Sequence, residues 1–552
     1  MKKLGKILWL SIIATLAIVS CKKDDETTAS NDNKALFAKV EEALGGKANL
    51  SSALTITYKS TGEAFEFQED PEPVNGKVAD FDYSLIYNLN GTQSKQSWNV
   101  NADYAFATDF SFVETIDHTK GKSEGTTGTF SANFSGFGVT GDPMFSTKLA
   151  ARQKTLLMSS PIAITKMIAK GAIQSTKAGI INVNFNTSPL GFGSDTPDIQ
   201  LVIDTDTNLP IKSQVLENDP LLGDVVYEVV YEKWETSNDL KYPTRLTHIL
   251  DGNIIRKESI SEVKINPEIE NTELTLTNEE AFSYNANEAK FGHLSSQFHF
   301  RTLLQTFPID FPVEIVTQSS PLALASELVA NDNNVYRVSG DFQSHYTYAF
   351  KIDGGLLLYD SPINDRRSKV VLDKIRQDFS TDPITYVVHS HNHFDHTGGL
   401  RGSLAEGGDL IVGQGSKSFI ENVLQRPSTV LPNPIANTPI NVTGVTDVMT
   451  IGTGDEKVAL YTISTLHAEE DDYIVLYKPA TKTIYFNDLY NPGFINVFDT
   501  FKTEDQQRMI ALAKDIVNFV DDKNLAVTTF HCSHGFTTLD FDFKTIRDIS
   551  QK

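Results

Sequence analysis

The chain has 552 residues, of which 40% are hydrophobic and 22% charged, and its net charge at pH 7 is −23. This length exceeds what one hydrophobic core usually supports, so we predict two folded domains and a targeting segment. The composition excludes a disordered chain and a polytopic membrane protein. The negative charge argues against nucleic-acid binding, because it would repel phosphates. A small anionic substrate stays open, since bound cations would reverse the local field.

The N-terminus has the pattern of an export signal. Three lysines occur in the first six residues, and an apolar run over 7–19 follows that is too short to span a bilayer comfortably. The run ends in Ile18-Val19-Ser20-Cys21, which resembles the lipobox of bacterial lipoproteins. The resemblance implies a signal peptide over 1–20, lipidation of Cys21 and a membrane anchor in the bacterial cell envelope, with the outer membrane favoured.

The residues after Cys21 are polar and start with the acidic cluster Asp24-Asp25-Glu26, so we predict a flexible tether over 21–33. Lipidation accounts for one of the two cysteines. The other, Cys532, is then a single thiol, and no intrachain disulfide is expected.

Residues 34–272 are predicted to form a β-rich accessory domain. A helix opens it and stops at Gly45-Gly46, and most of the remainder alternates between apolar and polar residues with turn formers such as Asn90-Gly91 between the runs. Helices are expected near 147–158 and 162–170. The pattern predicts a long, curved, mainly antiparallel sheet with a few helices against it.

This order of elements resembles the half-barrel of periplasmic lipoprotein carriers. The resemblance implies a concave apolar surface for a lipid or peptide, while a structural spacer is an equal alternative. His118 and His248 are isolated in the sequence, and we interpret each as an exposed or core histidine.

Residues 285–552 show a different, α/β pattern. A linking helix is predicted over 286–306. Further elements are predicted as strands at 335–338, 346–352, 355–360, 384–388 and 525–530, and as helices at 366–378 and 504–521.

A dense group of metal-binding side chains follows the 384–388 strand. His389, His391, His393, Asp395 and His396 fall within eight residues, ahead of Gly398-Gly399. Imidazole and carboxylate bind zinc and similar ions. On an extended strand end, His391 and His393 point to the same side and can share one ion. Asp395 and His396, on the turn beyond, can reach a second ion.

The spacing His-x-His-x-Asp-His before Gly-Gly resembles the signature of the metallo-β-lactamase-fold superfamily, over about 330–540. The resemblance implies an αββα sandwich and further ligands in chain order. Here His467 follows a strand, Asp488 ends the strand at 483–487, and His534 precedes a glycine.

The ligand set implied by this resemblance contains two ions, zinc first and iron or manganese as alternatives. It gives one ion to His391, His393 and His467, the other to Asp395, His396 and His534, and makes Asp488 the bridge. Asp360 is a supporting group, and His389 is favoured as a supporting or entrance residue over a ligand. For His345 a surface position is at least as favoured as one at the site mouth. Cys532 is interpreted as a buried, inert thiol.

The resemblance predicts a hydrolase of esters, thioesters, lactones or phosphodiesters that acts on a small molecule through a metal-bridging hydroxide, with Asp395 orienting it. An aspartate at position 488 argues against β-lactam cleavage, because the best-known group with that activity has cysteine there. The alternatives are a mononuclear iron persulfide dioxygenase and a non-catalytic surface binding lipoprotein. Loops 401–440 and 489–503 are expected to choose the substrate. The sequence leaves the oligomeric state open.

Overall fold

The computed structural model describes most of the chain. The described residues are 26–65, 76–103, 109–125, 139–177, 179–183, 198–281, 283–300, 325–329, 332–340, 344–465, 468–490, 495, 498–533 and 541–552. The predicted signal peptide, Cys21, His467 and His534 therefore lie outside the described residues. We call residues 26–300 the N-terminal half and residues 325–552 the C-terminal half.

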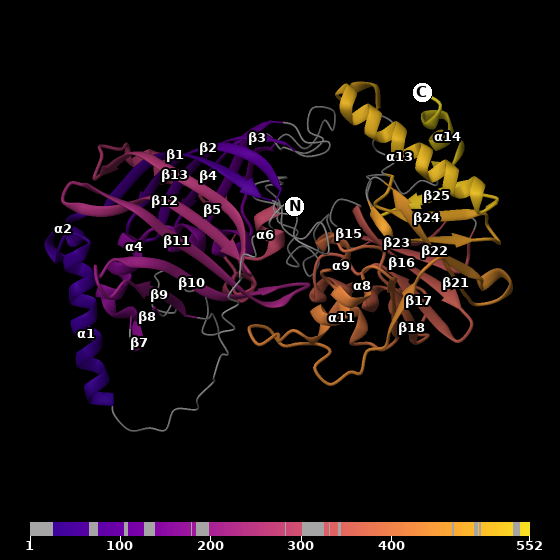
Figure 1. Ribbon diagram of the computed structural model, residues 1–552, viewed down its shortest axis with the longest axis horizontal. Coiled ribbons are helices and arrows are strands. Elements are labelled where there is room, and N and C mark those ends of the chain that lie inside the picture. The colour runs from indigo at the N-terminus through magenta and orange to yellow at the C-terminus, as the bar shows by residue number, and fades with distance from the viewer. Residues whose placement is uncertain are drawn as a thin grey trace, which may run out of the picture.

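The N-terminal half is built on one 13-stranded sheet in which every neighbouring pair is antiparallel, as predicted (Figure 1). Strands β1 to β6 form one meander and strands β7 to β13 form another. The two meanders join where β1 pairs with β13, with Ile56 opposite Ile265. The strands are β1 (Thr55–Phe65), β2 (Lys77–Asn88), β3 (Gln93–Ala102), β4 (Phe110–Asp117), β5 (Lys120–Gly125), β6 (Val139–Pro143), β7 (Ile173–Lys177), β8 (Ile180–Val183), β9 (Ile199–Ile203), β10 (Pro210–Asp219), β11 (Gly223–Ser237), β12 (Leu240–Leu250) and β13 (Asn253–Ile265).

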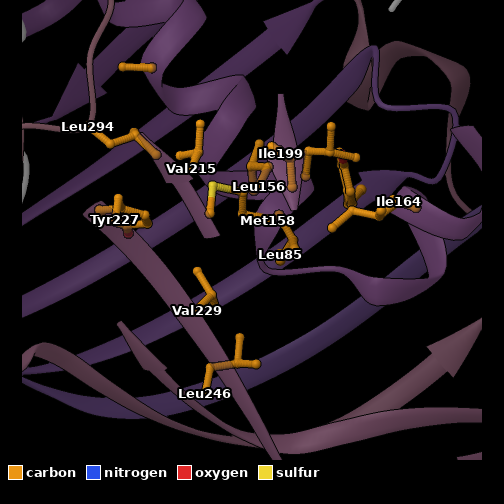
Figure 2. Packing of buried hydrophobic residues seen from close by; sticks show 14 of the residues in the cluster. Leu85, Leu156, Met158, Ile164, Ile199, Val215, Tyr227, Val229, Leu246 and Leu294 are labelled. Carbon is orange, nitrogen blue, oxygen red and sulfur yellow. The ribbon is translucent and has the colours of Figure 1, made fainter. Parts of the chain in front are cut away.

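Two helices cover the buried face of this sheet. They are α3 (Ser146–Met158) and α4 (Pro161–Met167), close to the predicted ranges. Figure 2 shows Leu156 and Met158 packed among strand residues such as Val215. The apolar surface that a lipid or peptide was expected to use is thus covered, in the described residues, by the chain's own helices. The likeness to a carrier half-barrel stays a prediction.

The first helix is longer than predicted. Helix α1 runs Glu26–Ala43, and the short α2 follows at Lys47–Ser52. Residues 26–33, predicted as part of a flexible tether, are therefore helical, which corrects the tether prediction for those residues. The sequence has no glycine or proline between Glu26 and Gly45, so no backbone feature interrupts the helix.

The predicted linking helix over 286–306 is also different in the structure. It is two short helices, α5 (Ala286–Ala289) and α6 (Ser296–Phe300), and residues 301–324 lie outside the described residues. Gly292 lies between them and approaches α3 so closely that an added Cβ would be 2.3 Å from the Thr147 carbonyl oxygen. This contact favours a break over a continuous helix.

The C-terminal half contains two sheets. The first has the order β14 to β20, antiparallel as far as β17 and parallel from β17 onward, and the second has the order β21 to β26 with one parallel pair, β24 and β25. The strands are β14 (Ala325–Leu328), β15 (Val335–Gly340), β16 (Ser344–Ile352), β17 (Gly355–Tyr359), β18 (Ile384–Val388), β19 (Asp409–Gly413), β20 (Val442–Val445), β21 (Val448–Ile451), β22 (Val458–Thr465), β23 (Ala468–Lys478), β24 (Thr483–Asn487), β25 (Thr529–Cys532) and β26 (Phe541–Asp542).

Helices cover both outer faces of this pair of sheets, which gives the predicted αββα sandwich. Side chains of the two sheets share one buried core, including Tyr359 and Tyr485. The longer helices are α8 (Asp365–Asp378), α11 (Lys417–Gln425), α13 (Thr503–Asp522) and α14 (Lys544–Ser550). The last predicted strand, 525–530, is shifted to β25, because the Leu525 amide still donates to the Val520 carbonyl at the end of α13.

No helix of the described residues is both long enough and apolar enough to cross a membrane.

Candidate metal centre

The histidine-rich segment lies where β18 ends. The chain leaves the sheet after Val388 and enters the one-turn helix α9 (Phe394–Thr397), which ends at Gly398, ahead of α10 (Leu400–Leu404). His391 is 5% exposed and His396 is fully buried. Asp395 and His396, predicted on a turn beyond the strand, are thus on α9. Burial makes an unpaired charge costly, so these side chains need partners or an ion.

Three of the predicted ligands come together across nearly 100 residues of chain. One nitrogen each of His391 and His393 and one carboxylate oxygen of Asp488 lie within 4.8 Å of one another. Asp488 directly follows β24. Its Oδ2 atom lies 3.3 Å from His393 Nδ1 and 3.7 Å from His391 Nε2. Two imidazoles and a carboxylate at these distances could hold one divalent cation.

His396 adjoins the same oxygen, and Asp395 adjoins His396. His396 Nε2 lies 3.8 Å from Asp488 Oδ2 and 3.8 Å from Asp395 Oδ2. The Oδ2 atom of Asp488 is therefore shared by the rings of His391, His393 and His396, while the bridging role of Asp488 stays a prediction. His467 and His534 were predicted to complete the two sets and lie outside the described residues.

Asp360 fixes which nitrogen each histidine offers. Its carboxylate accepts hydrogen bonds from the Ser390 amide at 2.9 Å and hydroxyl at 3.0 Å, and lies 3.0 Å from His396 Nδ1. The Ser390 hydroxyl in turn lies 2.8 Å from His391 Nδ1. The Nε2 atoms of both rings therefore face Asp488. This is the supporting position predicted for Asp360.

The ring of His391 is held in place on one side only. His391 Nε2 is buried and has no hydrogen-bond partner in the described part of the chain. Tyr473 stacks on the same ring at 4.5 Å, and its hydroxyl accepts a hydrogen bond from the Asp488 amide. A buried imidazole nitrogen fixed in place and left unbonded fits a metal ligand, and the donor set suits zinc.

His389 lies beside the cluster, in the predicted supporting role. Its Nε2 atom is 3.0 Å from the Asn392 side-chain oxygen, and Asn392 donates to the Ser416 hydroxyl. Ser416 then donates to Asp472 on β23. This buried chain of hydrogen bonds joins the loop that carries His391 to the strand that follows position 467.

Residues 340–421 match the family model of the metallo-beta-lactamase superfamily. The matched segment contains Asp360 and the whole run from His389 to His396. Asp488 lies outside it, so its membership of the site rests on the distances above. No curated protein matches the chain.

Two solved structures of DIM-1 metallo-beta-lactamase, one of them exposed to ceftazidime, align with the chain. Each shows 14% identity and a TM-score of 0.29 and covers 41% of this chain and 95% of that chain. The strand order and the helix layers define the sandwich architecture.

Burial and neighbouring charges shift the pKa values of two histidines in the 389–396 segment. Burial opposes a charge on His396, but the carboxylates of Asp395 and Asp360 outweigh it and raise the pKa to about 9. Burial and the neighbouring rings of His393 and His396 hold the pKa of His391 well below its usual value. His391 is thus neutral and able to donate a lone pair, while the proton on His396 must leave when a cation binds.

The sequence left His345 between a surface position, at least as favoured, and a position at the mouth of the site. Its side chain is buried, not on the surface, and its Nε2 atom lies 3.3 Å from Asp395 Oδ2. Its backbone is in the left-handed region, with φ +55°, and its carbonyl accepts a hydrogen bond from Arg367. Nothing in the spacing around residue 345 signals this position, because it depends on the irregular start of β16.

His531 and Cys532 lie on β25, and both side chains are buried. His531 stacks on Tyr485 at 5.1 Å, and burial lowers its pKa to about 3. Cys532 is buried and forms no disulfide among the described residues, as interpreted from the sequence.

Part of the predicted substrate loop 401–440 has a different contact. The Pro427 carbonyl accepts a hydrogen bond from the Asp224 amide, and the Asp224 carboxylate accepts one from the Thr429 amide at 2.8 Å. Residues 427–429 thus contact the N-terminal sheet, and the expectation that this loop chooses the substrate stays a prediction. Of the second loop, 489–503, residues 491–494 and 496–497 lie outside the described residues.

Proposed function

We propose that the chain is a metal-dependent hydrolase with two divalent cations, zinc first, in the C-terminal half. The observation that carries this proposal is the meeting of His391, His393 and His396 at Asp488, with the buried Nε2 atom of His391 left without a hydrogen bond. With its Nδ1 atom bonded to Ser390, the ring of His391 directs its other nitrogen at the carboxylate that His393 and His396 also adjoin, which is an arrangement suited to a bound cation.

In the proposed ligand set, His391 and His393 with His467 bind one cation, and Asp395 and His396 with His534 bind the other. Asp488 bridges the two. The placement of His467 and His534 in this set is taken from the superfamily resemblance. Asp360 holds the ring of His396 by its Nδ1 atom, and Ser390 does the same for His391.

Bound divalent cations supply a Lewis acid and lower the pKa of water at the site toward neutrality. The chain's own residues do the rest. The side chain of Asp395 is 17% exposed and can accept a proton or a hydrogen bond, and its Oδ2 atom lies 3.3 Å from His345 Nε2. The substrate classes proposed are esters, thioesters, lactones and phosphodiesters of small molecules.

Metal content and hydrolysis test this proposal together. The full-length chain in detergent is expected to bind two zinc equivalents by mass spectrometry and to turn over at least one member of a panel of those four classes. His391→Ala and Asp488→Ala should lose both metal and activity. His118→Asn is the matched control, because His118 is an exposed histidine at φ +59°, a conformation that asparagine tolerates.

Hydrolysis that persists in both alanine variants would exclude this site. One iron per chain without hydrolysis would favour the persulfide dioxygenase.

The proposed location is the bacterial cell envelope, with the outer membrane favoured and the lipid anchor on Cys21. The support is the sequence pattern alone, since Cys21 lies outside the described residues. Labelling with a radioactive fatty acid is expected in the native chain and lost in Cys21→Ala. Label retained in that variant would reject the anchor.

A further inference from the structure

Phe394 lies between two proposed ligands, His393 and Asp395, but its side chain packs elsewhere. It is 2% exposed and belongs to the hydrophobic core of the N-terminal half, the cluster that also contains Leu149 of α3 and Leu294. Helix α6 of the N-terminal half contacts α9, the helix that begins with Phe394. The ring at the centre of the metal-binding turn is thus buried in the other half of the molecule.

Two ion pairs hold the halves together on either side of this contact. Arg366 of α8 donates to both oxygens of Glu288, at 2.8 and 2.9 Å. Arg426, at the end of α11, donates to both oxygens of Asp251, at 2.7 and 3.0 Å. The loop after α11 reaches the N-terminal sheet, as Figure 1 also shows. The Arg426 pair uses two separate guanidinium nitrogens and so fixes an orientation as well as a distance, whereas Arg366 reaches both Glu288 oxygens from one nitrogen.

The first of these pairs is linked to the metal-binding turn through the backbone. The Ser361 amide donates to the His396 carbonyl at 3.0 Å, and the Gly399 amide donates to the Ser361 carbonyl at 2.8 Å. Ser361 leads directly into α8, where Arg366 lies. An added Cβ on Gly399 would be 2.8 Å from the Asn364 carbonyl oxygen, so α9 and the start of α8 are in close contact.

We infer that the N-terminal half is a positioning part of the metal centre, and that Phe394 is the residue through which it acts. A helix of one turn has too few internal hydrogen bonds to hold its own shape. Ligands must nevertheless be held within about 0.5 Å of their working geometry. Anchoring Phe394 in a close-packed core supplies that constraint between His393 and Asp395. This inference rests on the proposed function, since it assumes that those residues bind metal.

Zinc affinity measured by competition with a chelator tests the inference on the full-length chain. Phe394→Ala is expected to weaken zinc binding by roughly 10- to 100-fold, the range seen when residues that orient ligands are removed. Phe394→Leu keeps most of the apolar contact and should fall between that variant and the native chain. Activity should follow with a lower kcat and little change in KM.

Val423→Ala is the matched control. Val423 of α11 is also a buried member of the N-terminal core supplied by the C-terminal half, but it has no ligand beside it in the chain. Its loss should lower the melting temperature and leave zinc affinity within about threefold of the native value, because ligand orientation is untouched.

Native zinc affinity in a folded Phe394→Ala chain, or an equal loss in Val423→Ala, would overturn the inference. If Phe394→Ala fails to fold, Phe394→Leu decides, and native affinity there would overturn it as well. Measurements on the native chain distinguish a failure of this inference from a failure of the proposed function. A native chain without zinc or hydrolysis rejects the proposed function, whereas a native chain that binds zinc leaves the variant ratio to decide this inference.

Discussion

Both halves of the molecule bury clusters of ionisable side chains, and the two kinds of cluster are built differently. In the N-terminal half, Glu114 pairs with Lys148 and Arg152, and Glu217 with Lys154 and His293. Acid and base are matched, and each carboxylate lies against its cationic partners. In the C-terminal half, the rings of His391, His393 and His396 gather around Asp488.

The difference separates a structural cluster from a functional one. Burial would raise the pKa of Glu114, but Arg152 and Lys148 outweigh it and hold the pKa below its usual value, so the cluster is settled as an ion pair. At His391, burial and neighbouring histidines both lower the pKa, which leaves a neutral ring and a free lone pair. Matched charges need nothing further, whereas the neutral ring of His391 beside the carboxylate of Asp488 is suited to an added cation.

The largest effect on stability is expected from breaking a matched cluster. Glu114→Ala leaves Lys148 and Arg152 buried without their carboxylate, and we expect a loss of about 3–5 kcal/mol in the free energy of unfolding. Urea denaturation measures this loss of stability. The zinc affinity of the folded variant shows whether the metal centre is affected as well. Replacing the cluster by Glu114→Gln together with Lys148→Met and Arg152→Met should recover much of the loss. A change below about 1 kcal/mol for Glu114→Ala would contradict the comparison.

A smaller effect is expected from pH in the same half. Burial first, and then Arg256, lower the pKa of His248 to about 4, against the opposite effect of Glu258. The unfolded ring takes up a proton near pH 6.5, while the folded ring stays neutral until about pH 4. Stability from this group is therefore complete above pH 6.5 and falls as pH decreases toward 4, by roughly 3 kcal/mol.

The urea midpoint of the metal-free chain at pH 7 and at pH 4.5 checks this pH dependence. His299, whose pKa is also lowered to about 4, acts in the same direction and remains in the variant. His248→Gln should reduce the difference between the two midpoints, and an unchanged difference would reject the assignment.

The next effect concerns the metal centre and acts on affinity more than on stability. Asp360→Asn should weaken zinc binding by about 10- to 100-fold, because the amide is a poorer partner for His396 Nδ1 than a carboxylate is. Asparagine tolerates the left-handed backbone at this position, φ +65°, so the fold should persist. Chelator competition measures the loss. Asp353→Asn, an exposed aspartate bonded to Thr453, is the control and should bind zinc normally.

The sequence predicted features that depend on neighbours along the chain. Alternating strands and the run from His389 to Gly399 are local patterns. Asp488 was predicted as a ligand from the chain order of ligands in the superfamily that the sequence resembles. Pairings between distant segments were out of reach. The β1–β13 pair joins Ile56 to Ile265, and the charged residues of α3 are buried because Glu114 and Glu217 face them from strands. A helical pattern with Lys148, Arg152 and Lys154 predicts a solvent-facing side, and only the tertiary partners reverse that expectation.

His345 is a further case of that limit, and changing it is expected to give the smallest effect. His345→Asn keeps a residue suited to φ +55° but is too short to reach Asp395, 3.3 Å from the native ring. We expect kcat/KM to fall by less than about tenfold, equivalent to about 1.4 kcal/mol, with the melting temperature nearly unchanged. His345→Ala loses the same contact and adds backbone strain of roughly 1 kcal/mol, so it should also melt earlier. Equal melting temperatures for the two variants would show that the backbone at residue 345 is not strained in the alanine variant. Unchanged kcat/KM in both variants would show that His345 has a structural role, like the ion-paired residues of the N-terminal half.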